Sequence, residues 1–480
     1  MLAALGAAAA VAGVLALATL ACTLIGLADA DTAAVSIFAG LTLGLVFFSL
    51  SVRIAFAKRP LRATRSVSFR VLALLWLAVP IIASAPFLQL TDVTFPQAVF
   101  EAASAFTTTG GTIYTSLEDV PRSIIGWRAI LQWLGGLATL ASIIVVLAPS
   151  GAGGTPLLRF GGDMEQIFRT RLSSIIGVYS AMTLACFVLI FAAGIPAFEA
   201  FALSLSTLST GGMMPTDGTL SDYQTPLAEW IIGVFVLIGA TSLLWYRMVA
   251  TGRLGRSITL VESASVFAVA ALLSLAYAVA FARAAGSEEV LSIIDAAREG
   301  FVTATSLIST TGFEARNAGA AALPLALILV ILLVGGGMFS TAGGLKFYRL
   351  ALMTRHSVKE LERVLYPHSI STDQFGRFSY DTEAMRAVWT TLVLFVSAWA
   401  VSALVLASTG LPAPAALVAA LSNLSNIGQA YTFGWVEFGV WPAYAEMSPA
   451  ATHALVFTMI IGRLEIIGLI AGFGYQFLRK

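Results

Sequence analysis

The stretch Ser309-Thr310-Thr311-Gly312-Phe313 follows an apolar segment, residues 292–308, and the same arrangement occurs three more times in the chain. The three related stretches are Thr107-Thr108-Thr109-Gly110-Gly111, Leu208-Ser209-Thr210-Gly211-Gly212 and Ser425-Asn426-Ile427-Gly428-Gln429. The apolar segments before them are 95–107, 196–208 and 412–424. Most of the four segments are too short to cross a bilayer, which takes ~20 residues. Three begin at proline, which suits the first turn of a helix. The pattern predicts four short helices, each ending in a polar turn.

These turns indicate an internal fourfold repeat. Gly110, Gly211, Gly312 and Gly428 are 101, 101 and 116 residues apart, and the repeated unit is a span, a short helix, a Thr-Gly turn and a second span. Four such units can surround one central pore. Glycine allows dihedrals that turn carbonyl groups toward an axis, and rings of carbonyls replace the hydration shell of a cation. The alternative is four sets of small-residue helix contacts.

Composition places the chain in a membrane. Hydrophobic residues make up 58% of the 480 residues and charged residues 11%, and the mean hydropathy is +0.89. A soluble domain carries roughly 25% charged residues, so soluble enzymes, disordered scaffolds and nucleic-acid binders are disfavoured. The net charge of +1, the two cysteines and the three scattered histidines point to no charged partner, disulfide framework or metal site.

Ten apolar segments are candidate membrane spans: 4–28, 33–52, 70–88, 124–148, 172–194, 226–247, 258–282, 322–346, 385–408 and 448–477. Most of the 27 Lys and Arg residues lie in alternate connections, which places those connections and both termini in the cytoplasm. The N-terminal segment ends in a small-residue motif that resembles a signal-peptide cleavage site. We favour a retained span, because no Lys or Arg precedes Arg53.

The fold class expected is an all-α polytopic membrane protein. A two-span preface occupies residues 1–60. The four pore repeats occupy 61–155, 156–256, 257–384 and 385–480. The third repeat includes the glycine-rich segment and a cytoplasmic loop.

The eighth candidate span contains a glycine-rich break. Five of the ten residues from 335 to 344 are glycine, and each costs ~1 kcal/mol of helix propensity relative to alanine. Broken spans mark ion and substrate sites in transporters, so we expect a mobile loop across the pore. Tight helix packing is the alternative. A phosphate-binding loop is not, because Walker spacing is missing.

Arg463 lies within the last candidate span. Charges inside the membrane are costly and usually face a cavity. Glu465, two residues away, points to a different helix face and is a poor partner. Arg463 either snorkels to an interface or lies near a gate, where it could hold the glycine loop by hydrogen bonds to carbonyl groups.

These motifs together resemble the TrkH family of Trk-type potassium uptake subunits, within the wider Trk, Ktr and HKT superfamily. The resemblance covers nearly the whole chain. Besides the four turns and the glycine-rich break, it includes Trp127-Arg128, Gln132-Trp133-Leu134-Gly135-Gly136 and Gly462-Arg463-Leu464-Glu465. The two additional N-terminal spans resemble the Trk branch rather than the shorter Ktr branch.

The resemblance implies a potassium-selective filter and a gate. The implied filter residues are Thr108, Thr109, Gly110, Gly111, Ser209, Thr210, Gly211, Gly212, Thr310, Thr311, Gly312, Phe313, Asn426, Ile427 and Gly428. Potassium is expected at Thr108, Thr109, Ser209, Thr210, Thr310, Thr311, Asn426 and Ile427. The implied gating residues are Gly335, Gly336, Gly337, Ser340, Thr341, Gly343, Gly344, Lys346 and Arg463. In the HKT relatives, serine at the Gly110 position goes with sodium transport.

The resemblance also implies a location and partners. These are the bacterial inner membrane with its lipids, a homodimer, and a cytoplasmic nucleotide-binding regulatory subunit of the TrkA type. No organic cofactor and no nucleic acid are expected. The cytoplasmic segment 347–384 either anchors the chain through its positive charge or docks a partner.

One departure concerns the fourth turn, which in the family usually reads Asn-x-Gly-Pro-Gly. Here Gln429-Ala430 replace the Pro-Gly pair, and Glu314 and Arg316 place charges near the mouth of the third repeat. A less selective monovalent cation pathway and a proton- or sodium-coupled carrier therefore remain alternatives. An intramembrane enzyme is disfavoured, because no span pairs a nucleophile with a suitable base.

Overall fold

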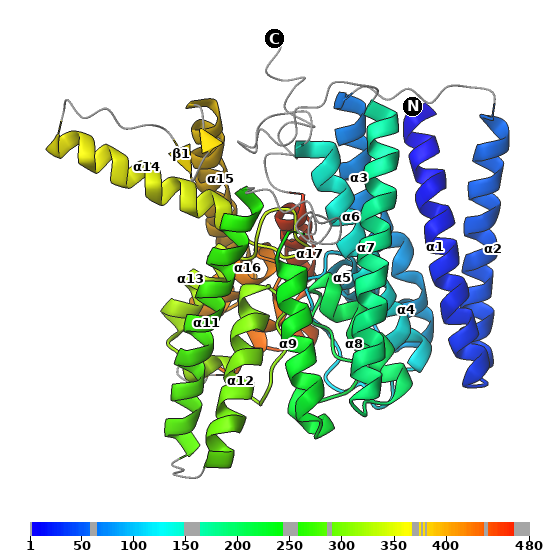
Figure 1. Ribbon diagram of the computed structural model, residues 1–480. Coiled ribbons are helices and arrows are strands. Elements are labelled where there is room, and N and C mark those ends of the chain that lie inside the picture. Colours follow the sequence, from blue (N-terminus) through cyan, green and yellow to red (C-terminus); the bar gives the residue numbers. More distant parts are fainter. Residues whose placement is uncertain are drawn as a thin grey trace.

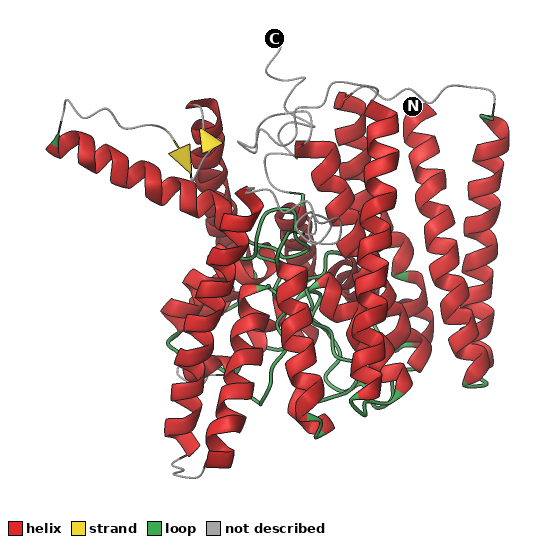
Figure 2. Ribbon diagram, viewed as in Figure 1, coloured by secondary structure: helices red, strands yellow, loops and turns green. Residues whose placement is uncertain are grey.

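The chain folds into a bundle of helices in which the element order repeats (Figures 1 and 2). The structure is a computed structural model that describes residues 2–57, 65–147, 164–242, 258–285, 290–366, 374–375, 378–379, 382–435 and 440–464. Within these ranges the regular secondary structure is helical except for a hairpin of β1 (Gln374–Phe375) and β2 (Phe378–Ser379). The all-helical prediction is confirmed.

Two long apolar helices, α1 (Leu2–Ala28) and α2 (Thr32–Ala55), lie at one edge of the bundle (Figure 1). Four related groups of helices follow them in the chain. The first group is α3 (Arg65–Ala83), α4 (Ala85–Leu90), α5 (Phe95–Phe106) and α6 (Arg122–Leu147). The second is α7 (Met164–Ala192), α8 (Ala197–Ser209) and α9 (Pro226–Ala240). The third is α11 (Ile258–Ala285), α12 (Val290–Ile308), α13 (Leu325–Val334) and α14 (Phe347–Leu365). The fourth is α15 (Thr382–Ser408), α16 (Ala413–Leu424) and α17 (Pro449–Arg463).

Short 3₁₀ helices lie in the connections after the short α-helices. They are η2 (Leu220–Tyr223), η3 (Ala320–Ala322), η4 (Gly428–Thr432) and η6 (Tyr444–Glu446). The loops gather at the centre of the bundle, surrounded by helices (Figure 2).

Helix packing closes the four groups into a ring. In each group the α-helix that follows the turn packs on the α-helix that precedes the turn of the next group: α6 on α8, α9 on α12, α13 on α16, and α17 on α5. The final contact returns the fourth group to the first, as a pseudo-fourfold arrangement requires. The helices that precede the turns, α5, α8, α12 and α16, therefore bring their C-terminal ends together inside the bundle.

Seven described helices are long and apolar enough to cross a membrane: Ala4–Ala28, Thr32–Ala55, Val71–Leu90, Arg122–Ser142, Leu172–Ala192, Glu262–Ala284 and Met385–Ser408. Their outward faces carry exposed leucines such as Leu17, Leu43, Leu184, Leu272 and Leu404. Apolar surface of this extent is stable against hydrocarbon rather than water. The chain is thus a multi-pass membrane protein.

In two of the other three candidate spans, the helix ends earlier than the sequence predicts; residues 243–247 of the first of these lie outside the described residues. Helix α9 ends at Ala240 rather than continuing to residue 247, because Thr241 is extended and the carbonyls of Gly239 and Ala240 accept N–H groups from a distant loop. Helix α13 ends at Val334, at the glycine-rich break. The part of the last candidate span beyond Leu464 lies outside the described residues.

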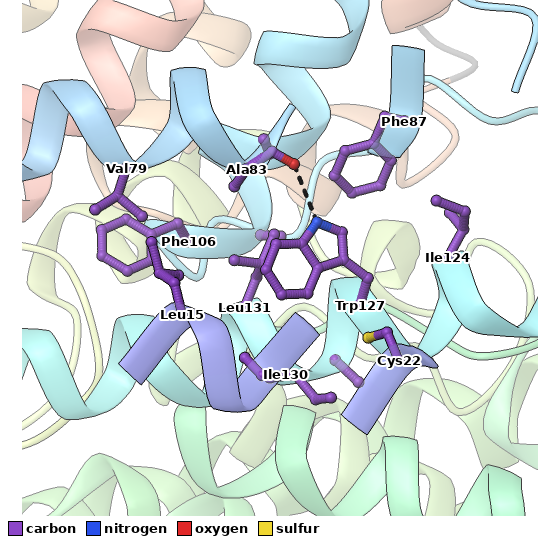
Figure 3. Close-up of a cluster of buried hydrophobic side chains, with 14 of the residues drawn as sticks. Leu15, Cys22, Val79, Ala83, Phe87, Phe106, Ile124, Trp127, Ile130 and Leu131 are labelled. Carbon is purple, nitrogen blue, oxygen red and sulfur yellow. Dashed lines mark hydrogen bonds between the residues drawn. The ribbon is translucent and has the colours of Figure 1, made fainter. Parts of the chain in front are cut away.

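The N-terminal pair is fastened to the first repeat through Trp127 of α6 (Figure 3). The indole is fully buried, and its ring packs edge to face with Phe38 of α2 at 5.9 Å between centroids. Its Nε1–H donates to the carbonyl of Ala83 at 3.0 Å, so the one polar atom of the side chain is satisfied. This packing fixes the first repeat on its outer side.

Candidate functional site

The four turns after the short helices share one unusual backbone conformation. Thr108, Thr210, Thr310 and Asn426 all have a left-handed φ, of 52°, 55°, 59° and 55°. This conformation is uncommon outside glycine and an outlier for a β-branched residue such as threonine. Strain of this kind costs of order 1–3 kcal/mol and clusters at functional sites. Its recurrence at one position in all four repeats identifies the turns as the candidate site.

Each turn is held by the same pair of backbone hydrogen bonds. The left-handed residue donates its N–H to the carbonyl three residues earlier. The next residue donates to a serine carbonyl five residues earlier, and the pairs are Thr109 to Ser104, Gly211 to Ser206, Thr311 to Ser306 and Ile427 to Ser422, at 2.8–2.9 Å. These bonds satisfy the last carbonyls of each short helix, as at other left-handed helix ends.

The four serines are a signal that the sequence interpretation missed. Each is buried and lies four residues before the left-handed residue of its turn. The spacing Ser-x-x-x-Thr, or Ser-x-x-x-Asn in the fourth repeat, is visible in the sequence and would have aligned the repeats.

The structure changes the alignment of the second repeat by one residue. Gly110, Gly212 and Gly312 have φ values of 81°, 79° and 89°. Gly212, rather than Gly211, therefore corresponds to Gly110, and the even spacing of 101 residues between glycines was a coincidence. In the fourth repeat Gly428 begins η4, and no positive φ is recorded for it.

Contacts between neighbouring turns form a closed ring. A Cβ atom at Gly110 would collide with the carbonyl oxygen of Gly211, and one at Gly212 with that of Thr311. Gly428 donates its N–H to the carbonyl of Thr109 at 2.5 Å. The third and fourth turns meet where the side chain of Gln429 lies against Gly312. The four predicted turns, 100 or more residues apart in the chain, therefore come together at one place.

Buried polar side chains hold the turns from behind. The Glu101 carboxylate pairs with Arg128 of α6 at 2.8 Å and accepts the N–H of Ile113 at 3.0 Å. Gln132 of α6 accepts the Ser206 hydroxyl at 2.8 Å and the N–H of Met213 at 3.2 Å. The chain beyond the first and second turns is thereby tied to the spanning helix α6.

A loop of residues 335–346 joins α13 to α14, where the sequence predicts a break. Gly335 ends α13 with a φ of 67°, and Gly344 has a φ of 76°. Because a Cβ atom on either glycine would collide with the facing strand of the loop, both positions need glycine. The two ends of the loop are joined by hydrogen bonds from Leu345 to Leu333 and from Lys346 to Val334, both of 3.0 Å.

The loop lies directly against three of the four turns. Gly343 donates its N–H to the Thr310 hydroxyl at 2.7 Å, and the Thr210 hydroxyl lies 3.3 Å from that of Thr341. A Cβ atom at Gly343 would collide with the carbonyl of Ser425 in the fourth turn. The loop therefore covers the helix side of the ring.

Thr341 and Arg463 fix the centre of the loop. Thr341 donates its N–H to the Gly239 carbonyl at 3.3 Å, and its hydroxyl lies within hydrogen-bond distance of the carbonyls of Leu208 and Gly239. Arg463 of α17 is buried and donates from Nη1 to the Thr341 carbonyl at 2.7 Å. A hydrogen bond from Arg463 to a carbonyl group of the glycine-rich loop is one of the two roles that the sequence analysis considers for this residue. Glu465 lies outside the described residues.

The remaining predicted gating residues shape the loop from within. Ser340 donates to the Gly337 carbonyl at 2.5 Å, and the ammonium group of Lys346 donates to the carbonyl of Ala342. Gly336 donates to the Gly343 carbonyl at 3.4 Å. These bonds keep the loop compact without regular helix.

Glu262 of α11 is a further anchor, and the sequence interpretation missed it. Its buried Oε1 accepts the N–H groups of Met338, within the loop, at 2.7 Å and of Tyr348, at the start of α14, at 3.1 Å. The available signal was an acidic residue inside an apolar span, which is rare and often functional.

Oxygen atoms of hydroxyl and backbone carbonyl groups dominate the site. Within the described ranges, no group of three or more His, Cys, Asp or Glu side chains could hold a metal ion. The ring joins the C-terminal ends of the short helices, where the helix dipole favours a positive charge. This chemistry suits a monovalent cation better than a tightly bound divalent one.

Comparison with known proteins agrees with this architecture. Residues 41–474 match the TrkH family, described as cation transport proteins. The Trk system potassium uptake protein TrkH of Salmonella typhimurium is 27% identical over 86% of each chain, and its counterpart in Halomonas elongata is 28% identical over 88% of each. The crystal structure of the potassium transporter TrkH from Vibrio parahaemolyticus superposes with a TM-score of 0.83. It is 25% identical, over 98% of this chain and 97% of that one.

Proposed function

Because this chain belongs to the TrkH family of cation transport proteins, we propose that it takes up potassium ions across the bacterial inner membrane through one central pore. Several relatives are named potassium uptake proteins. The observation that carries the proposal is the closed ring of four turns with one shared backbone conformation. Membership in a family of transport proteins also confirms that the chain is not an enzyme.

The ring is the proposed selectivity filter. Backbone carbonyl groups at Thr108, Thr210, Thr310 and Asn426, together with the hydroxyls of the three threonines, supply oxygen in place of the ion's hydration shell. The strained left-handed backbone, fixed by paired hydrogen bonds in each repeat, supports this role. A preformed ring of oxygen atoms needs little rearrangement when an ion arrives.

The loop of residues 335–346 is the proposed gate. It is fixed to three of the turns, to α9, to Glu262 of α11 and to Arg463 of α17. A buried guanidinium group near the path opposes a passing cation. Ions pass when the loop moves away from the ring, which breaks a small set of hydrogen bonds at Thr341 and Gly343.

A coupled carrier is the second candidate, since such carriers use a buried carboxylate at membrane depth. Glu262 is buried at 3% exposure, but its carboxylate accepts the backbone N–H of Met338 in the loop and that of Tyr348 at the start of α14. A carboxylate in this position stabilises the loop. We therefore favour passive flow through a gated pore.

The resemblance to Trk-type subunits extends the proposal to partners and orientation. We propose a homodimer with both termini in the cytoplasm and a nucleotide-binding regulatory subunit of the TrkA type. Helix α14 directly follows the gating loop and lies at the periphery of the bundle (Figure 1). Force applied to α14 by such a subunit would reach the gate through Phe347 and Lys346.

Rubidium uptake into liposomes tests the proposed function. The purified protein would be assayed with potassium, sodium and lithium as competitors, beside Gly110→Ser. Gly40→Ser is the matched control, because a Cβ at Gly40 has no atom within 4 Å. We expect potassium to compete far better than sodium, and Gly110→Ser alone to lose that preference. Equal competition by sodium in the unmodified protein would contradict potassium selectivity.

A further inference from the structure

The fourth turn differs from the other three at the residue after its glycine. Gly428 starts η4, and the long side chain of Gln429 follows it. This side chain lies close to the glycines of all three other turns. A Cβ atom added to Gly110 would lie 3.6 Å from Cγ of Gln429. One added to Gly212 would lie 3.3 Å from Oε1 of Gln429, and one added to Gly312 would lie 2.8 Å from the same oxygen. A side chain that approaches three turns of one ring must reach across the opening of that ring.

The carboxamide of Gln429 also binds an oxygen atom of the ring. Its Nε2 donates a hydrogen bond to the Gly212 carbonyl. An N–H donor carries positive partial charge and uses the lone pairs that a cation would need. The side chain therefore competes with a cation for this oxygen.

Gln429 and the gating loop lie on opposite sides of the ring. The loop contacts Thr210, Thr310 and Ser425, which follow the ends of α8, α12 and α16 by one or two residues. Gln429 contacts Gly110, Gly212 and Gly312, each of which lies two residues after the left-handed threonine of its turn. An ion on this path meets the Gln429 side chain at one end and the loop at the other.

We propose that Gln429 is a tethered plug of the outer mouth, whose carboxamide an incoming cation must displace before it reaches the filter. The proposal rests on the proposed transport function and adds a residue that sets the apparent affinity for the ion. The Gln429 backbone is held separately, because its carbonyl accepts the Thr432 hydroxyl at 2.9 Å. Rotation of the half-buried side chain alone then opens the mouth, without movement of the turn.

The competing interpretation is a structural one, in which Gln429 is a strut between the third and fourth turns. The two roles predict opposite effects of shortening the side chain. Removal of a plug leaves the ring intact and makes it more accessible to ions. Removal of a strut loosens the ring and weakens its discrimination between potassium and sodium.

The test is the dependence of rubidium uptake on external rubidium in liposomes, for Gln429→Ala and Gln429→Glu. Glutamate has nearly the same shape, cannot donate to the Gly212 carbonyl, and attracts cations. Gln89→Ala is the control, because Gln89 is exposed on α4, away from the ring. One amide hydrogen bond corresponds to a change of about 2- to 10-fold in binding.

We expect the KM for rubidium to fall about 2- to 10-fold in Gln429→Ala and at least as far in Gln429→Glu, with potassium still preferred over sodium. Gln89→Ala should match the unmodified protein. An unchanged or higher KM in both Gln429 variants would overturn the plug, and so would loss of the potassium preference. Failure of the unmodified protein to carry rubidium would instead remove the transport function on which the plug depends.

Discussion

Thr341 is the residue through which the gating loop can be weakened with the smallest change of shape. Its hydroxyl donates one proton, to the carbonyl of either Leu208 or Gly239. The Thr210 hydroxyl lies 3.3 Å away, but its own proton has a nearer acceptor in the Ser209 carbonyl at 2.7 Å. Valine has nearly the shape of threonine but no hydroxyl. Thr341→Val therefore removes one hydrogen bond that holds the loop in place.

The size of the effect follows from that bond. It contributes about 0.5–1.5 kcal/mol, which the closed loop loses relative to a displaced loop. Since every 1.4 kcal/mol changes an equilibrium tenfold, the open fraction rises by about 2- to 12-fold while it remains small. We expect the initial rate of rubidium uptake into liposomes to rise within this range.

Thr341→Ser is the matched control, because serine keeps the hydroxyl and loses only a methyl group. Its uptake rate should stay near that of the unmodified protein. Thermal unfolding in detergent would verify that both variants remain folded. Equal rates in Thr341→Val and the unmodified protein, with both proteins folded, would refute the assignment of this loop as the gate.

Three further predictions concern the ring and its supports. Gly212→Ala and Gly110→Ala should each abolish the preference for potassium over sodium in uptake competition. Both glycines have a left-handed φ, and a Cβ atom added to either would collide with the next turn. If Gly212→Ala kept the preference, the alignment of Gly212 with Gly110 would be refuted. Arg463→Leu should raise rubidium uptake about 10-fold or more, because a charge-assisted hydrogen bond to the loop contributes about 1.5–3 kcal/mol; an unchanged rate would show that this bond does not hold the gate. Glu101→Gln should lower stability by about 3–5 kcal/mol in thermal unfolding, because it leaves a buried Arg128 without its charged partner; an unshifted transition would show that the ion pair is not needed.

The sequence was most informative where a local rule repeats. An apolar segment, followed by a polar turn that contains glycine, predicted the helices α5, α8, α12 and α16. Three of these are too short to cross a membrane, whereas α12 has 19 residues. The run of glycines predicted the end of α13 at Val334, because glycine is unfavourable inside a helix. Both features depend on neighbouring residues, so no knowledge of the fold was required.

The sequence was less informative where the outcome depends on distant contacts. Either glycine of Gly211-Gly212 could match Gly110, since the choice is made by φ and by the close approach of Thr311. Glu262 is 76 residues from Met338 and 86 from Tyr348, and only the folded chain brings it beneath the loop. The early end of α9 likewise depends on loop residues about 100 positions away.

The most direct test of the account is the voltage produced by a potassium gradient alone. Liposomes that contain the protein and potassium would be diluted into sodium buffer without a proton gradient, and a voltage-sensitive dye would be recorded. A potassium-selective pore predicts a negative interior potential that grows with the potassium gradient and vanishes when potassium is equal on both sides. A potential of the same size with sodium in place of potassium, or one that requires a proton gradient, would contradict a potassium-selective pore.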